Sequence, residues 1–562
     1  MSNNIIGIDL GTTNSLVGSM QNGKPEIFKN ELGYDLTPSV VAVTEEGTII
    51  VGQPAKDRIV SHPNSGKACF KRDMGNKDLY KLSQKSLSPV ECSALILKEM
   101  KRIAEMRLGE PVTRAVISVP AYFRDAQRNA TLEAAAVAGL KVERIINEPT
   151  AAALAFGYKN PEKESNILVF DLGGGTFDIT LLEVFDGVIE VKSSGGESHL
   201  GGEDYTAALL DHITKREGLK IEAEKNNRWK EKIDLAKVEL SSKESTAFQH
   251  EDLEINISRT DLALAGKNLN ARMRPIIRKC LNDARLSPED INDVLLVGGA
   301  SRMPIIVEIV KAIIPTEPNY TIDPDRAIAL GACVQAALSA QDAAVDDIVL
   351  TDVSPHTLGI EIVRESPDGN HKEGYFAPVI NRNSTLPTSH SQIFHTMHPK
   401  QDQVDMKIYQ GESRLVSDNH FLGEILIKGL KEIQGQKNPG QVDVRFTYDM
   451  NGILEVELTI LSSGKKLNKI FEQRPGTMTE TEVNEAIKRL QPLKIHPRDS
   501  LPNRTKLEKA NRLYENLNAS ERDELSQIIN QFEIALDRQD KDYIEHMKSI
   551  LDQYLNHYKE LI

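Results

Sequence analysis

A short strand-like segment that ends in Asp-Leu-Gly occurs twice in this chain, and this repeat constrains the fold more than any other feature. The first copy reads Ile-Ile-Gly-Ile-Asp-Leu-Gly-Thr-Thr over residues 5–13, and the second reads Ile-Leu-Val-Phe-Asp-Leu-Gly-Gly-Gly-Thr over residues 167–176. Consecutive glycines permit a tight turn whose N–H groups can face an anion, and a neighbouring carboxylate suits the Mg²⁺ that accompanies a phosphate. A single copy would fit an ordinary tight hairpin equally well. Because internal repeats constrain a whole fold, we expect two similar lobes with one nucleotide between their phosphate loops.

Composition narrows the classes of protein that fit. The 562 residues are enough for several domains, and 40% hydrophobic with 27% charged residues is ordinary for a globular protein. The net charge of −14 argues against a general nucleic-acid binder. The cysteines have no paired spacing, so we expect neither a zinc site nor a disulfide framework.

Features of the chain also suggest where the protein acts. Unpaired cysteines fit the reducing cytoplasm best. The start of the chain runs directly into a strand, without the pattern of a signal peptide. The most apolar helical run, residues 327–340, is too short to cross a bilayer. We therefore expect a cytoplasmic protein with no membrane partner and no nucleic-acid partner.

The hydrophobic pattern changes twice along the chain. Up to about residue 340, strand-like runs alternate with helical spacing, which predicts an α/β architecture. From residue 352 to 471, apolar residues recur with a period of two between turns such as Asn451-Gly452, which predicts an antiparallel β domain. Past Pro475 the pattern becomes helical and highly charged, with a break near residues 492–502. The chain is therefore predicted to be multidomain, with an α/β, a β and an α part.

Two common nucleotide-binding patterns are missing from the sequence. It contains no G-x-x-x-x-G-K-[ST] and no G-x-G-x-x-G followed by a helix, so a nucleotide would have to be held by the repeated loops. The turn Gly298–Arg302 offers a further glycine contact and an arginine that could stack on a base. An ordinary surface turn would look the same.

The ordered motifs are similar to those of the DnaK-type seventy-kilodalton heat-shock chaperone family. Matching stretches are residues 7–15, 119–123, 145–153, 170–178, 199–204, 297–299 and 358–360. The resemblance extends to about residue 471 and is weak in the final helices. It implies an actin-like α/β ATPase domain (1–345), an interdomain linker (346–352), an antiparallel β-sandwich that binds peptide (353–475) and a short α-helical lid (476–562). The implied activity is that of an ATP-dependent chaperone, which couples ATP hydrolysis to the binding and release of unfolded or extended polypeptides.

The resemblance also assigns nucleotide roles to matching positions. The phosphates of ATP or ADP would be held by Gly11, Thr12, Thr13, Gly173, Gly174, Gly175, Thr176, Gly201 and Gly202. Asp9 and Asp171 would hold Mg²⁺ through its waters, and K⁺ is a further candidate ion. Lys71 would steady the γ-phosphate and the attacking water, although a solvated lysine is the usual interpretation of any single lysine.

Two carboxylates and a wall for the base complete the implied nucleotide site. Glu148 and Asp178 would orient the attacking water or accept its proton, with Thr176 near the γ-phosphate. The adenosine would lie between two sets of residues, Asp234, Lys237 and Ser241 on one side and Gly298, Gly299, Arg302 and Asp325 on the other.

Further matches concern coupling between domains and the binding of peptide. Pro120 and Arg128 match the family's proline switch and arginine relay, and Arg144 and Asp352 match an interdomain pair. A strand-end proline and surface charges are the plain alternative. Residues 348–350 resemble the apolar linker that docks on the ATPase domain in one state. The peptide pocket would be lined by Ile360, Ile362, Phe394, Val404 and Met406, under an arch of Val363 and Met397. Each of these could equally be plain core.

Several departures from the family pattern indicate a specialised member, similar to the bacterial HscC type. The region between Lys71 and Pro89 is short, which leaves the need for a nucleotide-exchange factor open. Arg124 replaces the usual asparagine near the surface used by J-domain partners, and Thr351 is polar where the linker normally has leucine. Residues 365–375 resemble an insertion near the peptide site. We expect unfolded or extended client polypeptides and a J-domain co-chaperone as partners.

Two alternatives belong to other functional classes. An actin-fold sugar kinase would share the repeated loops but would leave the linker and the β domain unexplained. A nucleotide-regulated binding module with negligible hydrolysis would keep all three parts and lack turnover.

Overall fold

The computed structural model describes residues 4–45, 47–159, 164–185, 188–219, 226–250, 253–342, 345, 349–365, 371–397, 401–430, 440–449, 454–471, 503, 506–507, 510, 513–514, 517, 519–538 and 541–558. Ile348 of the expected linker lies outside the described residues, as do residues 472–502, where the expected β domain ends and the expected lid begins.

Two six-stranded sheets share one plan. The first sheet has the order β11-β10-β1-β2-β3, with β4 paired to β2. Its strands are β1 (Ile5–Leu10), β2 (Asn14–Gln21), β3 (Lys24–Ile27), β4 (Thr37–Pro38), β10 (Arg114–Val119) and β11 (Lys141–Asn147). The second sheet has the order β18-β17-β12-β13-β14-β19. Its strands are β12 (Ser165–Leu172), β13 (Phe177–Phe185), β14 (Val188–Glu197), β17 (Asp293–Val297), β18 (Pro318–Asn319) and β19 (Val349–Leu350).

The equivalence of the two sheets confirms the two similar lobes expected from the repeat. β1 runs antiparallel to β2 and parallel to β10, and β12 runs antiparallel to β13 and parallel to β17. The turns after β1 and after β12 are the two Asp-Leu-Gly loops. They therefore leave the two sheets at equivalent points.

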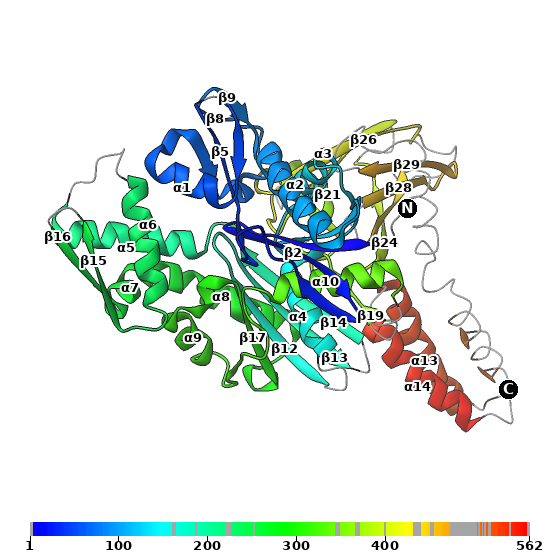
Figure 1. Ribbon diagram of the computed structural model, residues 1–562. Coiled ribbons are helices and arrows are strands. Elements are labelled where there is room, and N and C mark those ends of the chain that lie inside the picture. The colour runs from blue at the N-terminus through cyan, green and yellow to red at the C-terminus, as the bar shows by residue number, and fades with distance from the viewer. Residues whose placement is uncertain are drawn as a thin grey trace.

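Helices cover both sheets, and two of them lie between the sheets (Figure 1). The helices of this part are α1 (Gln53–Ser61), α2 (Pro89–Leu108), α3 (Asp125–Val137), α4 (Glu148–Lys159), α5 (Gly202–Glu217), α6 (Asn226–Glu239), α7 (Arg259–Ala265), α8 (Lys267–Ala284), α9 (Pro304–Lys311) and α10 (Ala327–Ala340). One buried cluster joins α4 and α10 to residues of both sheets, among them Ile5 and Ile167. Both helices are rich in alanine, which lets backbones approach closely, and a helix that is apolar on all sides is a buried one.

Local sequence explains where several elements begin and end. α2 begins with a capping box, in which the Ser88 side chain accepts from the Glu91 N–H and the Glu91 side chain accepts from the Ser88 N–H. It ends at Gly109, whose φ of 71° lies in the left-handed region. α10 begins at Ala327, three residues after Pro324. Pro324 accepts the Gly298 N–H through its carbonyl, and it lines a cleft.

Small sheets form the tips of the two lobes on either side of that cleft. β5 (Val40–Val43), β6 (Ile49–Val51) and β7 (Gly66–Ala68) form one sheet, and β8 (Tyr80–Leu82) pairs with β9 (Lys85–Leu87). β15 (Ser245–His250) pairs with β16 (Leu253–Ser258) in the other lobe. These tips lie at the top and at the left of Figure 1.

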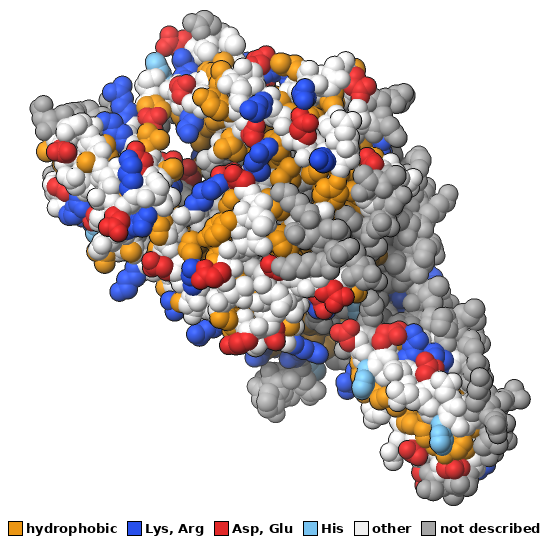
Figure 2. All heavy atoms as spheres, turned by 60° about the horizontal axis from the view of Figure 1, so that its bottom comes forward, with side chains coloured by type: hydrophobic (Ala, Val, Ile, Leu, Met, Phe, Trp, Pro, Cys, Tyr) orange, Lys and Arg blue, Asp and Glu red, His pale blue; other side chains and the backbone are white. Residues whose placement is uncertain are grey.

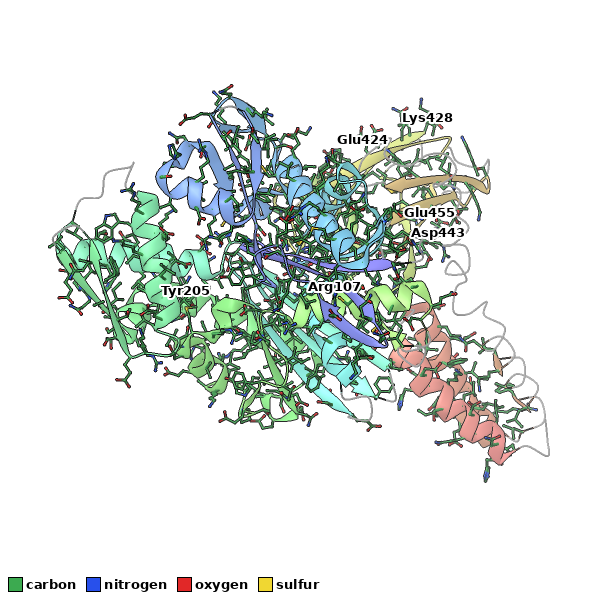
Figure 3. The ribbon with its side chains drawn as sticks, in the orientation of Figure 1. Arg107, Tyr205, Glu424, Lys428, Asp443 and Glu455 are labelled. Carbon is green, nitrogen blue, oxygen red and sulfur yellow. The ribbon has the colours of Figure 1, made fainter. Side chains whose placement is uncertain are left out.

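Two four-stranded antiparallel sheets form the β domain, as the period-two pattern predicted. The first contains β21 (Leu358–Glu365), β22 (His371–Ile380), β25 (Gln403–Gln410) and β26 (His420–Lys428). The second contains β24 (Thr388–His395), β27 (Gln441–Tyr448), β28 (Leu454–Ile460) and β29 (Lys465–Phe471). Their inner faces share one buried core that includes Ile408, Phe446 and Leu458. Figure 3 marks the first sheet by Glu424 and Lys428 and the second by Asp443 and Glu455.

Two further helices, α13 (Ala519–Arg538) and α14 (Lys541–His557), pack against each other through residues such as Leu525, Phe532 and Leu551. In Figure 1 they lie at the lower right, apart from β26, β28 and β29 at the upper right. Figure 2 shows basic and acidic side chains interspersed over one face of the molecule. Among the helices described, none is long and apolar enough to cross a membrane.

Candidate functional site

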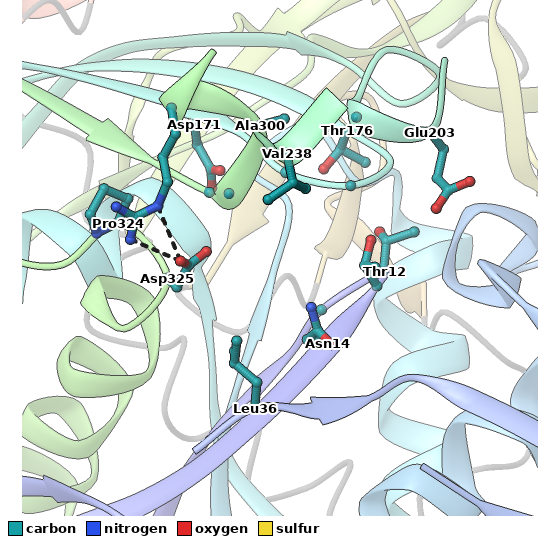
Figure 4. Close-up of a pocket in the computed structure, with 18 of the residues that line it drawn as sticks. Thr12, Asn14, Leu36, Asp171, Thr176, Glu203, Val238, Ala300, Pro324 and Asp325 are labelled. Atoms are coloured by element: carbon teal, nitrogen blue, oxygen red, sulfur yellow. Dashed lines mark hydrogen bonds and ion pairs between the residues drawn. The ribbon is translucent and has the colours of Figure 1, made fainter. Parts of the chain in front are cut away.

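The two Asp-Leu-Gly loops line one cavity of about 490 Å³ between the lobes. Figure 4 shows Thr12 and Asn14 of the first loop opposite Asp171 and Thr176 of the second. Both loops directly follow buried strands, so their positions are fixed by the two sheet cores. The cavity is therefore built by the sequence repeat itself.

The two phosphate loops are in direct contact. A Cβ added to Gly174 would lie 1.6 Å from Thr13 Oγ1, so only glycine lets the second loop approach the first this closely. A third glycine segment packs on the second loop, because the N–H groups of Gly202 and Glu203 donate to the carbonyls of Gly173 and Gly174, each at 2.9 Å. This contact places Gly202 and Glu203 at the same cavity.

A group of buried carboxylates lies at the base of the cavity. Burial, followed by the charge of Glu148, raises the pKa of Asp9 from 3.8 to about 7 and that of Asp178 to about 7. The same two causes hold the pKa of Asp171 well above its usual range. Carboxylates so close together repel one another, so the group favours the presence of cations.

Lys71 is the nearby cation. Its Nζ donates to Glu148 Oε1 at 2.5 Å, and both side chains are buried. Lys71 lies in the 3₁₀ turn η2 (Phe70–Asp73), and the next residue, Arg72, is paired with Asp204. Lys71 thus reaches the carboxylates from a segment that belongs to neither phosphate loop.

Asp178 is connected to the turn after β10. It lies opposite Asp171 on β13, and its Oδ1 accepts the Tyr122 N–H at 3.1 Å. Tyr122 follows Pro120, the residue that resembles the family's proline switch. A movement of this turn would therefore shift or break the hydrogen bond to Asp178, a carboxylate of the site.

Residues suggested for the adenosine side are also brought together. Lys237 Nζ donates to Asp234 Oδ1 at 2.6 Å and to the Gly202 carbonyl at 2.9 Å, so this lysine ties α6 to the third glycine segment. Ser241 lines the same cavity. On the opposite wall Gly298 has a φ of 79°, and a Cβ there would lie 2.5 Å from the Leu172 carbonyl oxygen.

Arg302 lies at that wall, and its guanidinium is already paired. Its Nη2 donates to Asp323 Oδ1 at 2.6 Å and to Asp325 Oδ2 at 2.9 Å, and Figure 4 shows the contact at Asp325. The two aspartates therefore orient the arginine at the edge of the cavity.

Apolar residues that the sequence interpretation missed also line the cavity. Leu235 and Val238 are 59% and 60% exposed on α6, and Leu36 and Met303 lie on the same cavity. The buried apolar stripe of α6 consists of Trp229, Ile233 and Ala236, and Leu240, directly after the helix, is also buried. Leu235 and Val238 lie outside that stripe on a highly charged helix. Two apolar residues on the exposed face of such a helix are the feature of the sequence that could have identified this wall. An apolar wall of this kind suits the face of a base.

The coupling residues surround a buried amide. Asn147 Nδ2 donates to Asp352 Oδ1 at 3.0 Å and Oδ2 at 2.8 Å, and Asn147 Oδ1 accepts from Arg128 Nη2 at 2.5 Å. Burial raises the pKa of Asp352, and the charge of Arg144 partly offsets that rise. Arg144 thus acts on Asp352 through its charge, while Asn147, which the sequence interpretation did not single out, makes the hydrogen bonds to Asp352.

The chain from β19 onward contacts the α/β part of the molecule at several further points. β19 pairs in parallel with β14, and Arg382 Nη2 donates to Asp283 Oδ1 at 2.7 Å. Asn383 Oδ1 accepts the Ser194 N–H at 3.2 Å. Long-range partners such as Asp283 and Arg382 carry no signal in a single sequence, because nothing in the chain links their positions.

The residues suggested for the peptide pocket form one cluster with the sandwich core. Ile360 and Met406 are buried in it, and Ile362, Phe394 and Val404 pack against it partly buried. Val363 and Met397, suggested as the arch, are half-buried and are not members of that cluster. The packing fits both a pocket wall and plain core.

Two buried atoms indicate whether the site suits the expected Mg²⁺. Asp171 Oδ2 and Thr13 Oγ1 have no hydrogen-bond partner among the described residues. Within the same part of the chain, no group of three or more His, Cys, Asp or Glu side chains is placed to hold a metal ion by itself. Two carboxylates with phosphate oxygens and water fit Mg²⁺, which keeps several of its waters.

Comparison with known proteins extends over almost the whole chain. Residues 5–561 match the family model described as Hsp70 protein. The chaperone protein DnaK of Thermotoga neapolitana is 40% identical over 503 residues, which is 86% of this chain and 82% of that protein. The chaperone protein DnaK of Thermosipho melanesiensis is 40% identical over 502 residues, with the same shares of the two chains.

Proposed function

This chain belongs to the Hsp70 family, the ATP-dependent chaperones that hydrolyse ATP and bind it with Mg²⁺, and from this premise we propose how its own residues perform the cycle. The observation that supports the proposal best is the contact between the nucleotide part and the β domain. Asp178 in the cleft is bonded to the Tyr122 N–H, and the nearby Asn147 amide is bonded to Asp352 at the start of β20 (Asp352–Val353). A short chain of contacts therefore connects the cleft to the β domain.

For hydrolysis, we assign positioning and charge neutralisation to the protein. Thr12, Thr13 and the N–H groups of residues 173–176 bind the phosphates, and Asp9 and Asp171 hold Mg²⁺, which neutralises phosphate charge when bound. Lys71 Nζ binds the γ-phosphate. It lies 2.5 Å from Glu148 Oε1, so its charge is beside the carboxylate that orients the water. Glu148 and Asp178 orient the attacking water and accept its proton. K⁺ is proposed as a further ion of this carboxylate-rich site.

For the adenosine, we assign one wall to α6 and the other to the segment after β17. Asp234, Lys237 and Ser241 lie on the first wall, together with Leu235 and Val238. Gly298, Gly299, Arg302 and Asp325 lie on the second. The aspartates that pair with Arg302 keep its guanidinium at the edge where a base would stack.

The proposed domain boundaries follow the sequence analysis. The ATPase domain comprises residues 1–345, the linker 346–352, the β-sandwich 353–475 and the lid 476–562. In this assignment β19 belongs to the linker, and its pairing with β14 is the docked arrangement of the linker. Pro120, Arg128, Arg144 and Asp352 transmit the nucleotide state, and Ile360, Ile362, Val363, Phe394, Met397, Val404 and Met406 contact the client.

Specialisation within the family is a further part of the proposal. The short segment between Lys71 and Pro89 forms only the hairpin β8–β9, and β21 and β22 extend into the insertion. These departures support an HscC-type member that works in the cytoplasm with a J-domain co-chaperone. Because the segment between Lys71 and Pro89 is short, the need for a nucleotide-exchange factor has to be measured.

The proposal is tested by ATPase activity measured with and without an unfolded peptide, together with release of a labelled peptide by ATP. We expect the peptide to stimulate hydrolysis and ATP to accelerate its release. Asp352→Asn, which keeps the shape of the side chain, should hydrolyse ATP with little stimulation by peptide. Equal stimulation in Asp352→Asn and in the unchanged chain would contradict the coupling route.

A further inference from the structure

His356 lies in the contact between the β domain and the ATPase domain. It follows β20 in the chain, and its ring packs edge-on against Tyr122, with ring centroids 4.6 Å apart. Tyr122 belongs to the turn after β10, the same turn whose N–H reaches Asp178. His356 is 5% exposed. The ring is therefore buried at the contact between the two domains.

The surroundings of His356 disfavour its protonated form. Burial comes first, and the positive charges of Arg124, Arg128 and Lys279 add to it, so that the pKa of His356 falls from 6.5 to about 3. A hydrogen bond to the Tyr122 backbone acts in the opposite direction. Glu412 lies at the neighbouring residue, where it accepts from the N–H and the hydroxyl of Thr357. Glu412 Oε2 also forms an ion pair with Arg382 Nε at 3.6 Å.

The interface leaves two polar atoms without partners. His356 Nε2 and Thr351 Oγ1 are buried and make no hydrogen bond to any described residue. A buried polar group without a partner costs about 1–3 kcal/mol. Both costs apply only to the docked arrangement, because undocking returns the two groups to water. The contact is thus weakened at two residues. His356 can be protonated, whereas the hydroxyl of Thr351 does not titrate.

We propose that His356 makes docking of the β domain sensitive to pH, so that protonation of this ring releases the β domain from the ATPase domain. This inference rests on the proposed function, in which the docked arrangement accompanies bound ATP and favours client release. A proton on Nε2 would place a charge beside Arg124 and Arg128, in a position with no acceptor. In acid the chain would therefore keep its client even with ATP bound.

The sign and range of the effect follow from linkage. The docked state has the lowered pKa, so below pH 6.5 the undocked state takes up a proton that the docked state takes up only near pH 3. Docking is unaffected above about pH 7. It weakens by about tenfold for each pH unit below 6.5, which gives about tenfold between pH 7.5 and pH 5.5.

The test measures docking of the full chain by energy transfer between two dyes. Val137→Cys on α3 and Ser463→Cys in the turn after β28 are exposed positions on the two domains. Cys69, the one partly exposed cysteine, is replaced by serine, and Cys92, Cys280 and Cys333 are buried. The docking equilibrium is read with saturating ATP at pH 7.5 and pH 5.5, before appreciable turnover.

Three variants separate the possible causes. The unchanged interface should lose about tenfold in docking between the two pH values. His356→Leu and His356→Phe, of which the second keeps a ring against Tyr122, should lose less than twofold. Thr351→Val removes only the buried hydroxyl, so docking should strengthen equally at both pH values while the tenfold loss persists.

The outcomes distinguish this inference from the function on which it rests. If ATP causes no change in energy transfer at pH 7.5, the proposed coupling itself is wrong. If ATP causes docking that is equally strong at both pH values, the coupling stands and the role of His356 is overturned. A tenfold loss that persists in both His356 variants would also overturn it, because another group would then be responsible.

Discussion

The two phosphate loops occupy equivalent places in two sheets of one plan, but their aspartates have different neighbours. Asp9 lies beside β10, where the Ser118 hydroxyl donates to Asp9 Oδ1 at 2.7 Å. Asp171 lies beside Val297 of β17, which offers no hydrogen bond from its side chain, and Asp171 Oδ2 has no partner among the described residues. Across the hairpin, Asp9 faces Leu16, whereas Asp171 faces a second carboxylate, Asp178.

The difference teaches how a duplicated scaffold acquires separate roles. The first loop satisfies its aspartate within its own lobe and supplies two threonine hydroxyls. The second loop leaves an oxygen of its aspartate open, adds a second carboxylate and presents bare glycine N–H groups. We therefore expect the second loop to depend more strongly on the bound metal than the first. Substitutions that act on one loop at a time can break or sharpen this expectation.

Lys71 should give the largest effect, because it is the cation that both loops share. Lys71→Ala should retain nucleotide binding and lose at least about 100-fold in turnover, since the charge beside the γ-phosphate is removed. Single-turnover hydrolysis and nucleotide titration check the two parts. Glu148 is then buried without its partner, which can cost about 3–5 kcal/mol of stability. Lys71→Met with Glu148→Gln removes the unpaired buried charge and checks stability alone, and turnover of Lys71→Ala equal to that of the unchanged chain would refute the role of Lys71.

Gly174 tests the contact between the two loops. Gly174→Ala should weaken ATP binding by about tenfold or more, because the added Cβ would lie 1.6 Å from Thr13 Oγ1. Gly173→Ala is the matched control, since its Cβ would meet nothing closer than the Thr176 carbonyl oxygen at 3.9 Å. Calorimetric titration with ATP compares the two. If removing the hydroxyl by Thr13→Ala restores no affinity to Gly174→Ala, the steric explanation is wrong.

Asp9 and Asp171 test the unequal dependence on metal directly. Asp171→Asn should raise the Mg²⁺ concentration for half-maximal ATPase activity by about tenfold, and Asp9→Asn by about threefold, because Asp9 shares its charge with Ser118. Mg²⁺ titrations of the initial rate, at one saturating ATP concentration, give both values. Equal shifts for the two variants would mean that the surroundings of the two aspartates do not matter.

Ser118→Ala should give the smallest effect. The hydrogen bond from Ser118 lowers the pKa of Asp9, which is about 7, so loss of this bond raises that pKa. A raised pKa leaves less of the charged form near pH 7, and about a twofold higher Mg²⁺ requirement should appear there and vanish at pH 8.5. Thr180→Ala, which removes another buried hydroxyl of the sheets, serves as the control. The same increase at both pH values would contradict the explanation.

Much of the fold could be predicted from local patterns. The antiparallel β domain was predicted from the period-two pattern of residues 352–471, and the capping box at Ser88 and the glycine at 109 define α2. Such features are local, because capping and hydrophobic periodicity act within a few residues. The bond from the Gly298 N–H to the Pro324 carbonyl, in contrast, joins distant segments, and no local pattern indicates it.

The candidate site shows the same division. The repeat alone placed Asp9 and Asp171 at one cleft, since equal local sequences following equal strands give equal turns. It gave no indication that Ser118 would donate to one aspartate and that the other would lie beside Val297. Those neighbours belong to strands that are distant in the sequence.

The sequence by itself thus determined the two loops, the order of the three parts and the family. Only the tertiary structure decided which charges meet, from Lys71 and Glu148 in the cleft to Asp352 and Asn147 at the interface. It also decided that His356 and Thr351 are buried without partners, and that Leu235 and Val238 line the cavity. The physical reason is that strand formation and turns depend on near neighbours, whereas burial and pKa depend on atoms brought together from distant parts of the chain.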